Sequence, residues 1–233
     1  MALALFDLDN TLLDGDSDFL WGEFLVELGA VDPVAFGTAN RRFYRQYLDG
    51  TLDIQEFHAF SLGLLARNPP ATLIAWRERF IAERIAPNLP ADAHALVAGH
   101  RAAGDRLAIV TATNSFVTAP IAPLLGVPTL IGTDPETDAA GRFTGRVAGV
   151  AAFRAGKVER VLAWLGADAA LLDSATFYSD SHNDLPLLER VAHPVAVNAD
   201  PLLAEVASRR DWRMLRIGPG HAQQLHARRQ ASG

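Results

Sequence analysis

The chain has 233 residues, 49% of them hydrophobic, enough to bury the core of one domain or of a domain with one insertion. It contains no cysteine, which excludes disulfides, thiolate metal sites and cysteine nucleophiles and favours a cytoplasmic location. The formal net charge of −6 repels a polyanion, so nucleic acid is not expected as a partner. No run approaches the roughly 20 apolar residues of a membrane helix, and the apolar start lacks a basic flank, so neither membrane insertion nor export is expected.

Short apolar runs recur along the chain, and each ends in small or polar residues. Such runs are typical of strands buried on both faces, and helical patterns lie between most of them, at 158–165, 185–191 and 201–208. This alternation predicts an α/β fold, a Rossmann-like parallel sheet with helices on both faces. The expected strands are 2–6, 107–110, 128–131, 177–178, 194–197 and 214–217. A short segment between glycines, 141–147, alternates in polarity and predicts a hairpin.

One interval, from about residue 19 to residue 103, contains no strand-like run. Apolar stripes at helical spacing occupy it instead, the first ending at Gly29 as a C-cap and the second opening with the capping pair Asp53 and Glu56. The sequence therefore predicts a small all-helical cap domain at 15–86, inserted into a core formed by 1–14 and 87–233.

Two carboxylates, Asp7 and Asp9, directly follow the first expected strand. Ligands of open parallel sheets bind at the carboxyl ends of the strands. Carboxylates at i and i+2 of such a turn can converge on one cavity, where a cation or a proton must offset their repulsion. The alternative is a pair of solvated loop aspartates.

Two further positions carry polar groups at the same edge of the sheet. Thr111 ends the second expected strand, where its hydroxyl is able either to bind a phosphate oxygen or to cap the next helix. Lys157, the only lysine of the chain, lies near the start of a predicted helix, against the helix dipole. A facing anion or carboxylate cluster would explain that position, and a solvent-exposed lysine is the alternative.

The segment 178–184 lies between an expected strand and a helix. It adds the carboxylates of Asp180 and Asp184, hard oxygen ligands of the kind that suit Mg²⁺. The alternative is a loop in which one aspartate caps the helix that follows.

Together these four segments resemble the motifs of the haloacid dehalogenase superfamily, in the same order and over residues 3 to 200. The first motif, Asp-x-Asp-x-Thr, reads Asp7-Leu8-Asp9-Asn10-Thr11, and the others fit Thr111, Lys157, and Asp180 with Asp184. Ser179 stands where the fourth motif usually has glycine. The helical insertion after the first motif is similar to that of the phosphoserine-phosphatase-like branch. Ala112 and Thr113 replace glycines of the phosphoserine phosphatases, which argues against phosphoserine itself.

The resemblance implies a Mg²⁺-dependent phosphomonoesterase that acts on a small phosphorylated metabolite through an aspartyl-phosphate. Asp7 would be the nucleophile, and Asp9 the general acid and base. Mg²⁺ would be held by Asp7, by the main-chain carbonyl of Asp9 and by Asp180. Asp184, Asn183 and Ser181 would support the metal and its water. Thr111 and Lys157 would bind the phosphoryl oxygens.

Other readings of the same motifs stay open. A dehalogenase of the superfamily lacks the second aspartate, so Asp9 argues against halide displacement. A phosphotransferase or mutase would keep every motif and differ only in the acceptor. A catalytically silent phospho-ligand-binding protein would have lost a motif residue, and none is lost here. The insertion could serve a homodimer instead of substrate choice.

Asp16 lies nine residues after Asp7, where phosphoserine phosphatases carry a glutamate that meets the substrate's amino group. An aspartate there predicts a small phosphomonoester with a cationic amine: histidinol phosphate, phosphoethanolamine or phosphoserine, in falling order. The alternative is that Asp16 caps the first helix of the insertion. The arginines at positions 41, 42 and 45 either pair with a substrate carboxylate or are solvated.

Overall fold

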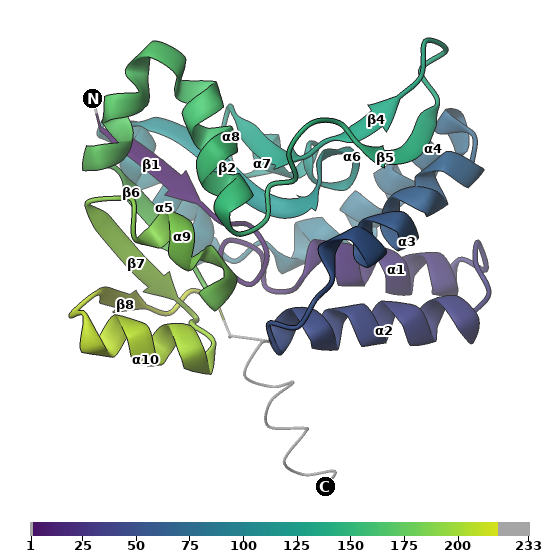
Figure 1. Ribbon diagram of the computed structural model, residues 1–233, viewed down its shortest axis with the longest axis horizontal. Helices are drawn as coiled ribbons and strands as arrows, with labels where there is room; N and C mark the ends of the chain where they lie inside the picture. The colour runs from purple at the N-terminus through teal and green to yellow at the C-terminus, as the bar shows by residue number, and fades with distance from the viewer. Residues whose placement is uncertain (1, 219–233) are drawn as a thin grey trace, which may run out of the picture.

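Six parallel strands form one sheet in the order β3-β2-β1-β6-β7-β8 (Figure 1). The computed structural model describes residues 2–218, so the end of the expected core, 219–233, lies outside the described residues. Every predicted apolar run is a strand: β1 (Leu3–Phe6), β2 (Arg106–Asn114), β3 (Leu130–Thr133), β6 (Thr176–Ser179), β7 (His193–Val197) and β8 (Arg213–Leu215). The chain leaves β1 in one direction and returns to β6 on its other side. This switch point at the carboxyl ends of β1 and β6 is where ligands of such sheets bind.

The strand boundaries differ from the prediction at most ends, and two of these differences have a structural reason or consequence. β2 continues to Asn114 and so carries Thr111 and Thr113 within the strand. β8 ends at Leu215, because the N–H of Ile217 donates to Oδ1 of Asn198 at 3.1 Å instead of continuing the ladder.

Side chains of β1 alternate between two hydrophobic clusters, one on each face of the sheet. Leu3 and Leu5 belong to the cluster that includes residues of α8 (Ala155–Leu165), α9 (Leu185–Leu188) and α10 (Pro201–Arg209). Ala4 and Phe6 belong to the other, with residues of α5 (Ala91–Ala102), α6 (Ser115–Thr118) and α7 (Ile121–Leu124). The sheet is therefore covered on both sides, as its continuous apolar runs predict (Figure 1). α9 is shorter than the predicted 185–191 because the chain turns at Glu189 and Arg190 to enter β7.

Four helices follow β1 before the chain returns to the sheet: α1 (Ser17–Glu27), α2 (Ala35–Leu48), α3 (Ile54–Arg67) and α4 (Pro70–Phe80). A π-helical turn, η1 (Ile81–Ile85), and a 3₁₀ turn, η2 (Ala86–Asn88), then lead to α5. The predicted caps are present: Gly29 follows α1 with φ +70°, and the Asp53 carboxylate accepts from the N–H groups of Gln55 and Glu56.

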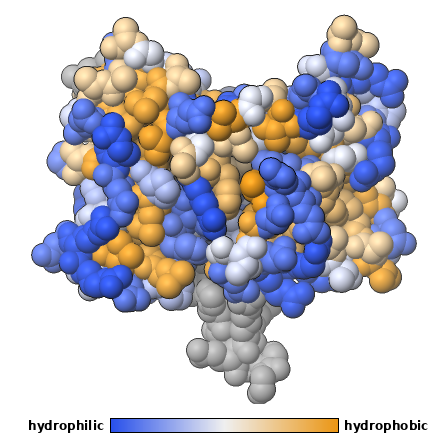
Figure 2. Space-filling view, in the orientation of Figure 1, coloured by the Kyte–Doolittle hydropathy of each residue, from blue (hydrophilic) through white to orange (hydrophobic). Residues whose placement is uncertain are grey.

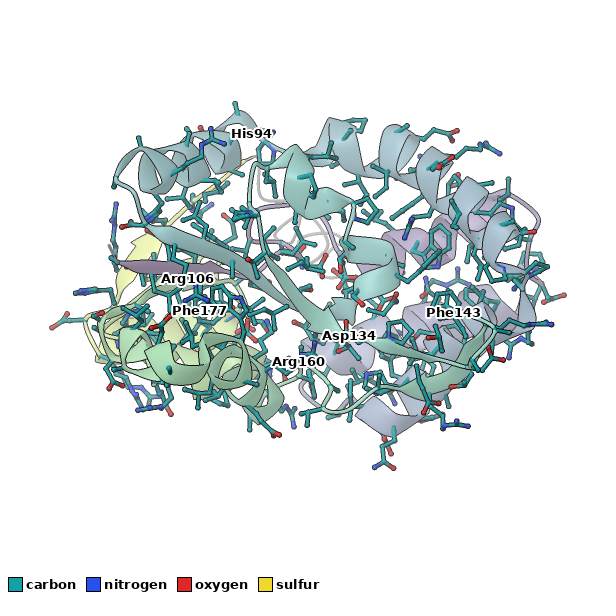
Figure 3. The ribbon with its side chains drawn as sticks, turned by 90° about the horizontal axis from the view of Figure 1, so that it is seen from above. His94, Arg106, Asp134, Phe143, Arg160 and Phe177 are labelled. Atoms are coloured by element: carbon teal, nitrogen blue, oxygen red, sulfur yellow. The ribbon has the colours of Figure 1, made fainter. Side chains whose placement is uncertain are left out.

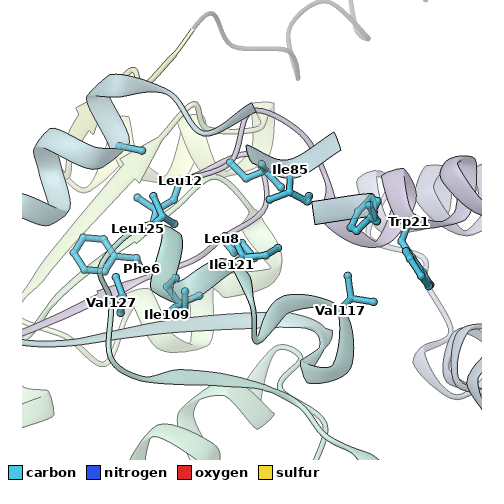
Figure 4. Packing of buried hydrophobic residues seen from close by; sticks show 14 of the residues in the cluster. Phe6, Leu8, Leu12, Trp21, Ile85, Ile109, Val117, Ile121, Leu125 and Val127 are labelled. Carbon is cyan, nitrogen blue, oxygen red and sulfur yellow. The ribbon is translucent and has the colours of Figure 1, made fainter. Parts of the chain in front are cut away.

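The hydrophobic core of the sheet continues into these inserted helices (Figure 4). Phe6 and Ile121 lie at the sheet, Val117 lies between, and Trp21 of α1 lies at the far end. The Trp21 ring is 5.2 Å from the ring of Phe80 in an edge-to-face arrangement, so α1 and α4 are packed together by aromatic contact.

The predicted hairpin exists, but only its second strand lies within the predicted segment 141–147. β4 (Pro135–Thr137) precedes the segment 141–147, and β5 (Phe143–Val147) is its second strand, with which β4 pairs antiparallel. The turn is held by the Asp138 side chain, which accepts from the N–H groups of Ala140 and Arg142, and by Gly141, whose φ is +75°. The sequence reading missed β4 because it began the hairpin at Gly141, which belongs to the turn.

This hairpin extends from the core to the inserted helices. At its base, Asp134 forms an ion pair with Arg160 of α8, and Figure 3 shows the two side by side while Phe143 lies toward the inserted helices. Further along, a Cβ at Gly145 would lie 3.5 Å from that of Ala66 in α3. The hairpin therefore covers α3 from the side of the core.

Hydrophilic and hydrophobic residues are interspersed on the face of the molecule shown in Figure 2. None of the helices between residues 2 and 218 combines the length and the apolar composition that crossing a bilayer requires.

Candidate active site

The predicted site residues converge at the carboxyl ends of β1, β2 and β6 and at the start of α8. Asp7 follows β1 directly, and its N–H donates to the carbonyl of Tyr178 in β6 at 2.8 Å. That bond continues the hydrogen-bond ladder one residue beyond β1, so the sheet fixes the position of the Asp7 backbone from which the carboxylate side chain extends. Asp7, Thr111, Lys157 and Asp180 are all buried.

Lys157 lies between two carboxylates. Its Nζ donates to Oδ1 of Asp7 at 2.8 Å and to Oδ2 of Asp184 at 2.7 Å, and the residue is only 2% exposed. Burial alone lowers the pKa of Lys157, but Asp184 and Asp7 raise it by more, so the net shift is upward. The lysine is therefore a fixed positive charge beside Asp7 and Asp184, which accounts for its placement against the helix dipole.

Asp9 is held by three donors. Its Oδ1 accepts from the N–H of Ser17 at 2.7 Å, and its Oδ2 accepts from the hydroxyls of Thr113 at 2.8 Å and Thr111 at 3.3 Å. The sequence reading missed Thr113. The signal was present, because side chains at i and i+2 of a strand point the same way, and β2 carries Thr111 and Thr113 at that spacing.

Asp180 lies opposite Asp7, at the end of β6. Its Oδ1 accepts from the Thr11 hydroxyl at 3.2 Å, and its carbonyl accepts from the N–H of Asp200 at 2.8 Å. Burial raises the pKa of Asp180 well above its usual value, and the nearby carboxylates of Asp7 and Asp184 raise it further. Burial likewise raises the pKa of Asp7 to about 7, with Lys157 opposing the shift and Asp184 and Asp9 adding to it.

The crowding of these carboxylates fits a divalent cation. One lysine faces Asp7, Asp180 and Asp184, so negative charge remains uncompensated, and hard oxygen donors are the ligands that Mg²⁺ prefers. Between residues 2 and 218 no group of three or more Asp, Glu, His or Cys side chains is arranged to hold a metal by itself. The expected set differs from such a group because it combines the carboxylates of Asp7 and Asp180 with the main-chain carbonyl of Asp9.

Ser181 and Asn183 connect this cluster to the inserted helices. The Ser181 hydroxyl accepts from the N–H of Asn183 at 3.2 Å and shares a hydrogen bond with the Tyr47 hydroxyl. Nδ2 of Asn183 donates to the carbonyl of Tyr47 at 3.3 Å, and its Oδ1 accepts from Nε of Arg154 at 3.1 Å. Tyr47 and Arg154 were not predicted, because nothing local in the sequence relates α2 to the loop after β6.

A pocket opens from the Asp7 and Asp9 carboxylates toward α1, α2 and α3. Its unfilled space is about 580 Å³, open solvent at the mouth included. Six of its fifteen lining residues are aromatic: Phe19, Phe43, Tyr44, Tyr47, Phe57 and Phe153. Asp16, Asp18 and Asn40 supply polar groups, and no lysine, arginine or histidine of the described chain lines it.

Asp16, the predicted selectivity residue, lines this pocket and also caps α1. Its Oδ1 accepts from the N–H of Phe19 at 2.8 Å, which is the alternative role the sequence allowed. The three arginines do not line the pocket. Arg41 and Arg42 pair with Glu23 and Glu56 on the exposed surface, and Arg45 donates to the carbonyl of Arg41.

Comparison with known proteins gives the same picture. Residues 4–189 match the family model of the haloacid dehalogenase-like hydrolases. A histidinol-phosphatase of Neisseria meningitidis serogroup C (strain 8013) is 41% identical over 216 residues, which cover 91% of this chain and 97% of that protein. Phosphoserine phosphatase SerB1 of Mycobacterium tuberculosis (strain ATCC 25618 / H37Rv) is 32% identical over 214 residues, 91% of this chain and 69% of that one.

Two solved structures share the fold. The crystal structure of a protein of unknown function from Bordetella pertussis Tohama I has a TM-score of 0.86 and 50% identity, covering 92% of this chain and 97% of that one. A substrate-bound phosphoserine phosphatase has a TM-score of 0.68 and covers 97% of each chain, but at 17% identity it supports the fold alone.

The parallel sheet, the helical insertion after β1 and the acidic cluster around one buried lysine define a phosphatase. The chain belongs to the haloacid dehalogenase-like hydrolases.

Proposed function

We propose that the protein is a Mg²⁺-dependent phosphomonoesterase that hydrolyses histidinol phosphate through an aspartyl-phosphate on Asp7. The arrangement that carries this proposal is the buried triplet of Asp7, Lys157 and Asp184, with Lys157 within 2.8 Å of both carboxylates. A positive charge beside the attacking oxygen offsets the repulsion between a carboxylate nucleophile and a phosphate dianion.

Each side chain has a distinct task in this mechanism. Asp7 attacks phosphorus, the ester oxygen leaves, and the resulting acyl phosphate is hydrolysed by water in a second step. Asp9, oriented by Thr111 and Thr113, gives a proton to the leaving oxygen and takes one from the attacking water. Asp7, Asp180 and the Asp9 carbonyl would hold Mg²⁺, which supplies positive charge to the phosphoryl oxygens when bound. Asp184 keeps Lys157 in place.

The substrate assignment rests on the pocket and on the similarity to the Neisseria histidinol-phosphatase. Phosphoserine carries a carboxylate, which would meet four aspartates in this pocket and no basic side chain from the described part of the chain. Histidinol phosphate carries an ammonium group and an imidazole ring but no carboxylate. The aromatic walls suit the ring, and the aspartates suit the cation.

The insertion 15–86 serves as the cap domain on a core formed by 1–14 and 87–233. α1, α2 and α3 supply most of the pocket walls, so they bound the space in which the part of the substrate beyond the phosphate lies. The core would bind the reacting phosphate and would add Ala112, Thr113 and Phe153 to the walls of the pocket.

The test is phosphate release by the wild type and by Asp7→Asn from histidinol phosphate, phosphoethanolamine and phosphoserine, with Mg²⁺ and water as sole acceptor. We expect turnover of the first two, with histidinol phosphate preferred, and none by the variant. A preference for phosphoserine would refute the assignment of histidinol phosphate as the substrate. Turnover that depends on an added alcohol or sugar acceptor would identify a phosphotransferase instead.

A further inference from the structure

Two pocket aspartates stand at the start of α1, and the structure treats them differently. The Asp16 carboxylate accepts hydrogen bonds from the N–H groups of Phe19, at 2.8 Å, and of Asp18. Two of its acceptor positions are therefore engaged by the helix terminus. No hydrogen bond or ion pair to the Asp18 carboxylate is found within residues 2–218.

Asp18 faces the same cavity as the proposed nucleophile. The pocket is continuous from Asp7 and Asp9 to Asp18, and the ring of Phe19 stacks on that of Tyr44 in its wall with centroids 4.6 Å apart. A carboxylate beside aromatic faces, in a pocket that no Lys, Arg or His of residues 2–218 lines, is an environment that a ligand cation would complete.

We propose that Asp18 is the specificity-determining residue that binds the cationic group of the substrate, while Asp16 caps the start of α1. This inference rests on the proposed function. The substrate class is thereby a phosphomonoester with an ammonium or imidazolium group and without a carboxylate. This assignment replaces the earlier expectation that Asp16 reads the amine.

The electrostatics of the two residues agree with this division. Burial raises the pKa of Asp18 to about 7, with Asp9 adding to the shift, and no hydrogen bond opposes it. The pKa of Asp16 is also raised by burial and by Asp9, but the N–H groups of Phe19 and Asp18 oppose that shift. A bound cation would stabilise the ionised form of Asp18 most, because nothing else does so.

The experiment compares three variants of the full chain. Asp18→Asn removes the proposed cation partner. Asp16→Asn keeps a residue that caps helices well but removes the negative charge of the other pocket aspartate at the start of α1. Asp92→Asn is the matched control, since Asp92 is also an acidic residue in the first turn of a helix, α5, but lies outside the pocket and is exposed.

Each variant is assayed on histidinol phosphate, phosphoethanolamine and glycerol phosphate, the last of which has no cation. We expect Asp18→Asn to lower kcat/KM about tenfold or more for the two cationic esters and less than about threefold for glycerol phosphate. Asp16→Asn and Asp92→Asn should change all three esters about equally. A selective loss in Asp16→Asn, or an equal loss on all esters in Asp18→Asn, would overturn the proposal.

A binding measurement separates this proposal from the proposed function. Calorimetric titration of histidinol phosphate into Asp7→Asn and into Asp7→Asn/Asp18→Asn should show about tenfold weaker binding to the double variant, with no turnover required. Equal affinities would overturn the role of Asp18 even if the wild type is a phosphatase. Absence of phosphate release by the wild type would refute the catalytic proposal and leave the affinity difference to decide the role of Asp18.

Discussion

Arg154 donates from its Nε to Oδ1 of Asn183 at 3.1 Å, and its Nη2 also donates to the carbonyl of Gly50 at 2.8 Å. One side chain thus ties the loop after β6 to the turn between α2 and α3. Its backbone has φ +51° and ψ −122°, a region that favours glycine and costs about 1–3 kcal/mol for other residues.

This relationship predicts that stability and activity separate at position 154. Both Arg154→Ala and Arg154→Gly lose the tie, so kcat/KM should fall about three- to tenfold in each, as expected for lost hydrogen bonds of ~0.5–1.5 kcal/mol. Only glycine removes the backbone strain at φ +51°, so Arg154→Gly should be more stable than Arg154→Ala by about 1 kcal/mol or more. Urea denaturation and steady-state kinetics measure both. Arg142→Ala, an exposed arginine in the hairpin turn, is the control. Equal stability of the two variants would argue against strain at this residue.

Asp7→Asn should abolish turnover and leave the fold intact. The amide has nearly the same shape but cannot attack phosphorus, and loss of a covalent nucleophile lowers kcat by about 10⁴ or more. Lys157 keeps its partner Asp184 in this variant, so the folded state retains one of its two buried ion pairs. Phosphate release and circular dichroism are the two measurements. Turnover within about tenfold of the wild type would refute the nucleophile assignment.

Lys157→Met should destabilise the protein strongly. Removing the cation leaves Asp7 and Asp184 buried together without compensation, and breaking a buried ion pair in this way costs about 3–5 kcal/mol. The double variant Lys157→Met/Asp184→Asn should recover part of this loss, because one of the two repelling charges is gone. Urea denaturation in EDTA measures the free energy of unfolding in the absence of a stabilising metal ion. A loss below about 1 kcal/mol in the single variant would show that the buried charges are compensated elsewhere.

Phosphate release should require Mg²⁺ and stop in EDTA, and Ca²⁺ should inhibit it. Ca²⁺ accepts more ligands at longer distances, so Asp7 would bind it through both oxygens and lose its attacking lone pair. Mg²⁺ should also raise the melting temperature by offsetting the repulsion between Asp7 and Asp180, and Asp180→Asn should remove most of that increase. Full activity after exhaustive dialysis against EDTA would contradict the metal dependence.

Thr113→Val should lower kcat with little change in KM. The Thr113 hydroxyl donates to Oδ2 of Asp9 at 2.8 Å. Without this bond the carboxyl group of Asp9, the proposed general acid and base, can rotate away from the leaving oxygen. We expect about a tenfold decrease in kcat, restored in large part by Thr113→Ser, which keeps the hydroxyl. Thr38→Val on the exposed surface of α2 is the control. A failure of serine to restore kcat would mean that Thr113 acts through packing.

The order of elements could be predicted from the sequence because it depends on local chemistry. Apolar runs such as the one before Asp7 indicate buried strands, and the stripes between residues 19 and 103 indicate helices, of which the last, α5, covers the sheet. The second strand of the hairpin could be predicted, but its first strand, β4, was missed, because the turn formed by Asp138 and Gly141 lies at the start of the predicted segment.

The sequence by itself determined which residues come together at the sheet edge. Asp7 and Asp180 directly follow strands, Thr111 lies in the second half of β2 and Lys157 lies in the first turn of α8, and parallel topology brings such positions to one place. Only the tertiary structure decided how the site is supported and bounded. The Thr113 hydroxyl bonds to Asp9, which lies 104 positions earlier in the chain. The Arg154 side chain bonds to the carbonyl of Gly50, which also lies 104 positions earlier. Which of Asp16 and Asp18 is engaged by the helix terminus likewise depends on the direction of each side chain. These contacts depend on the packing of distant segments, and no local pattern in the chain encodes a distance between them.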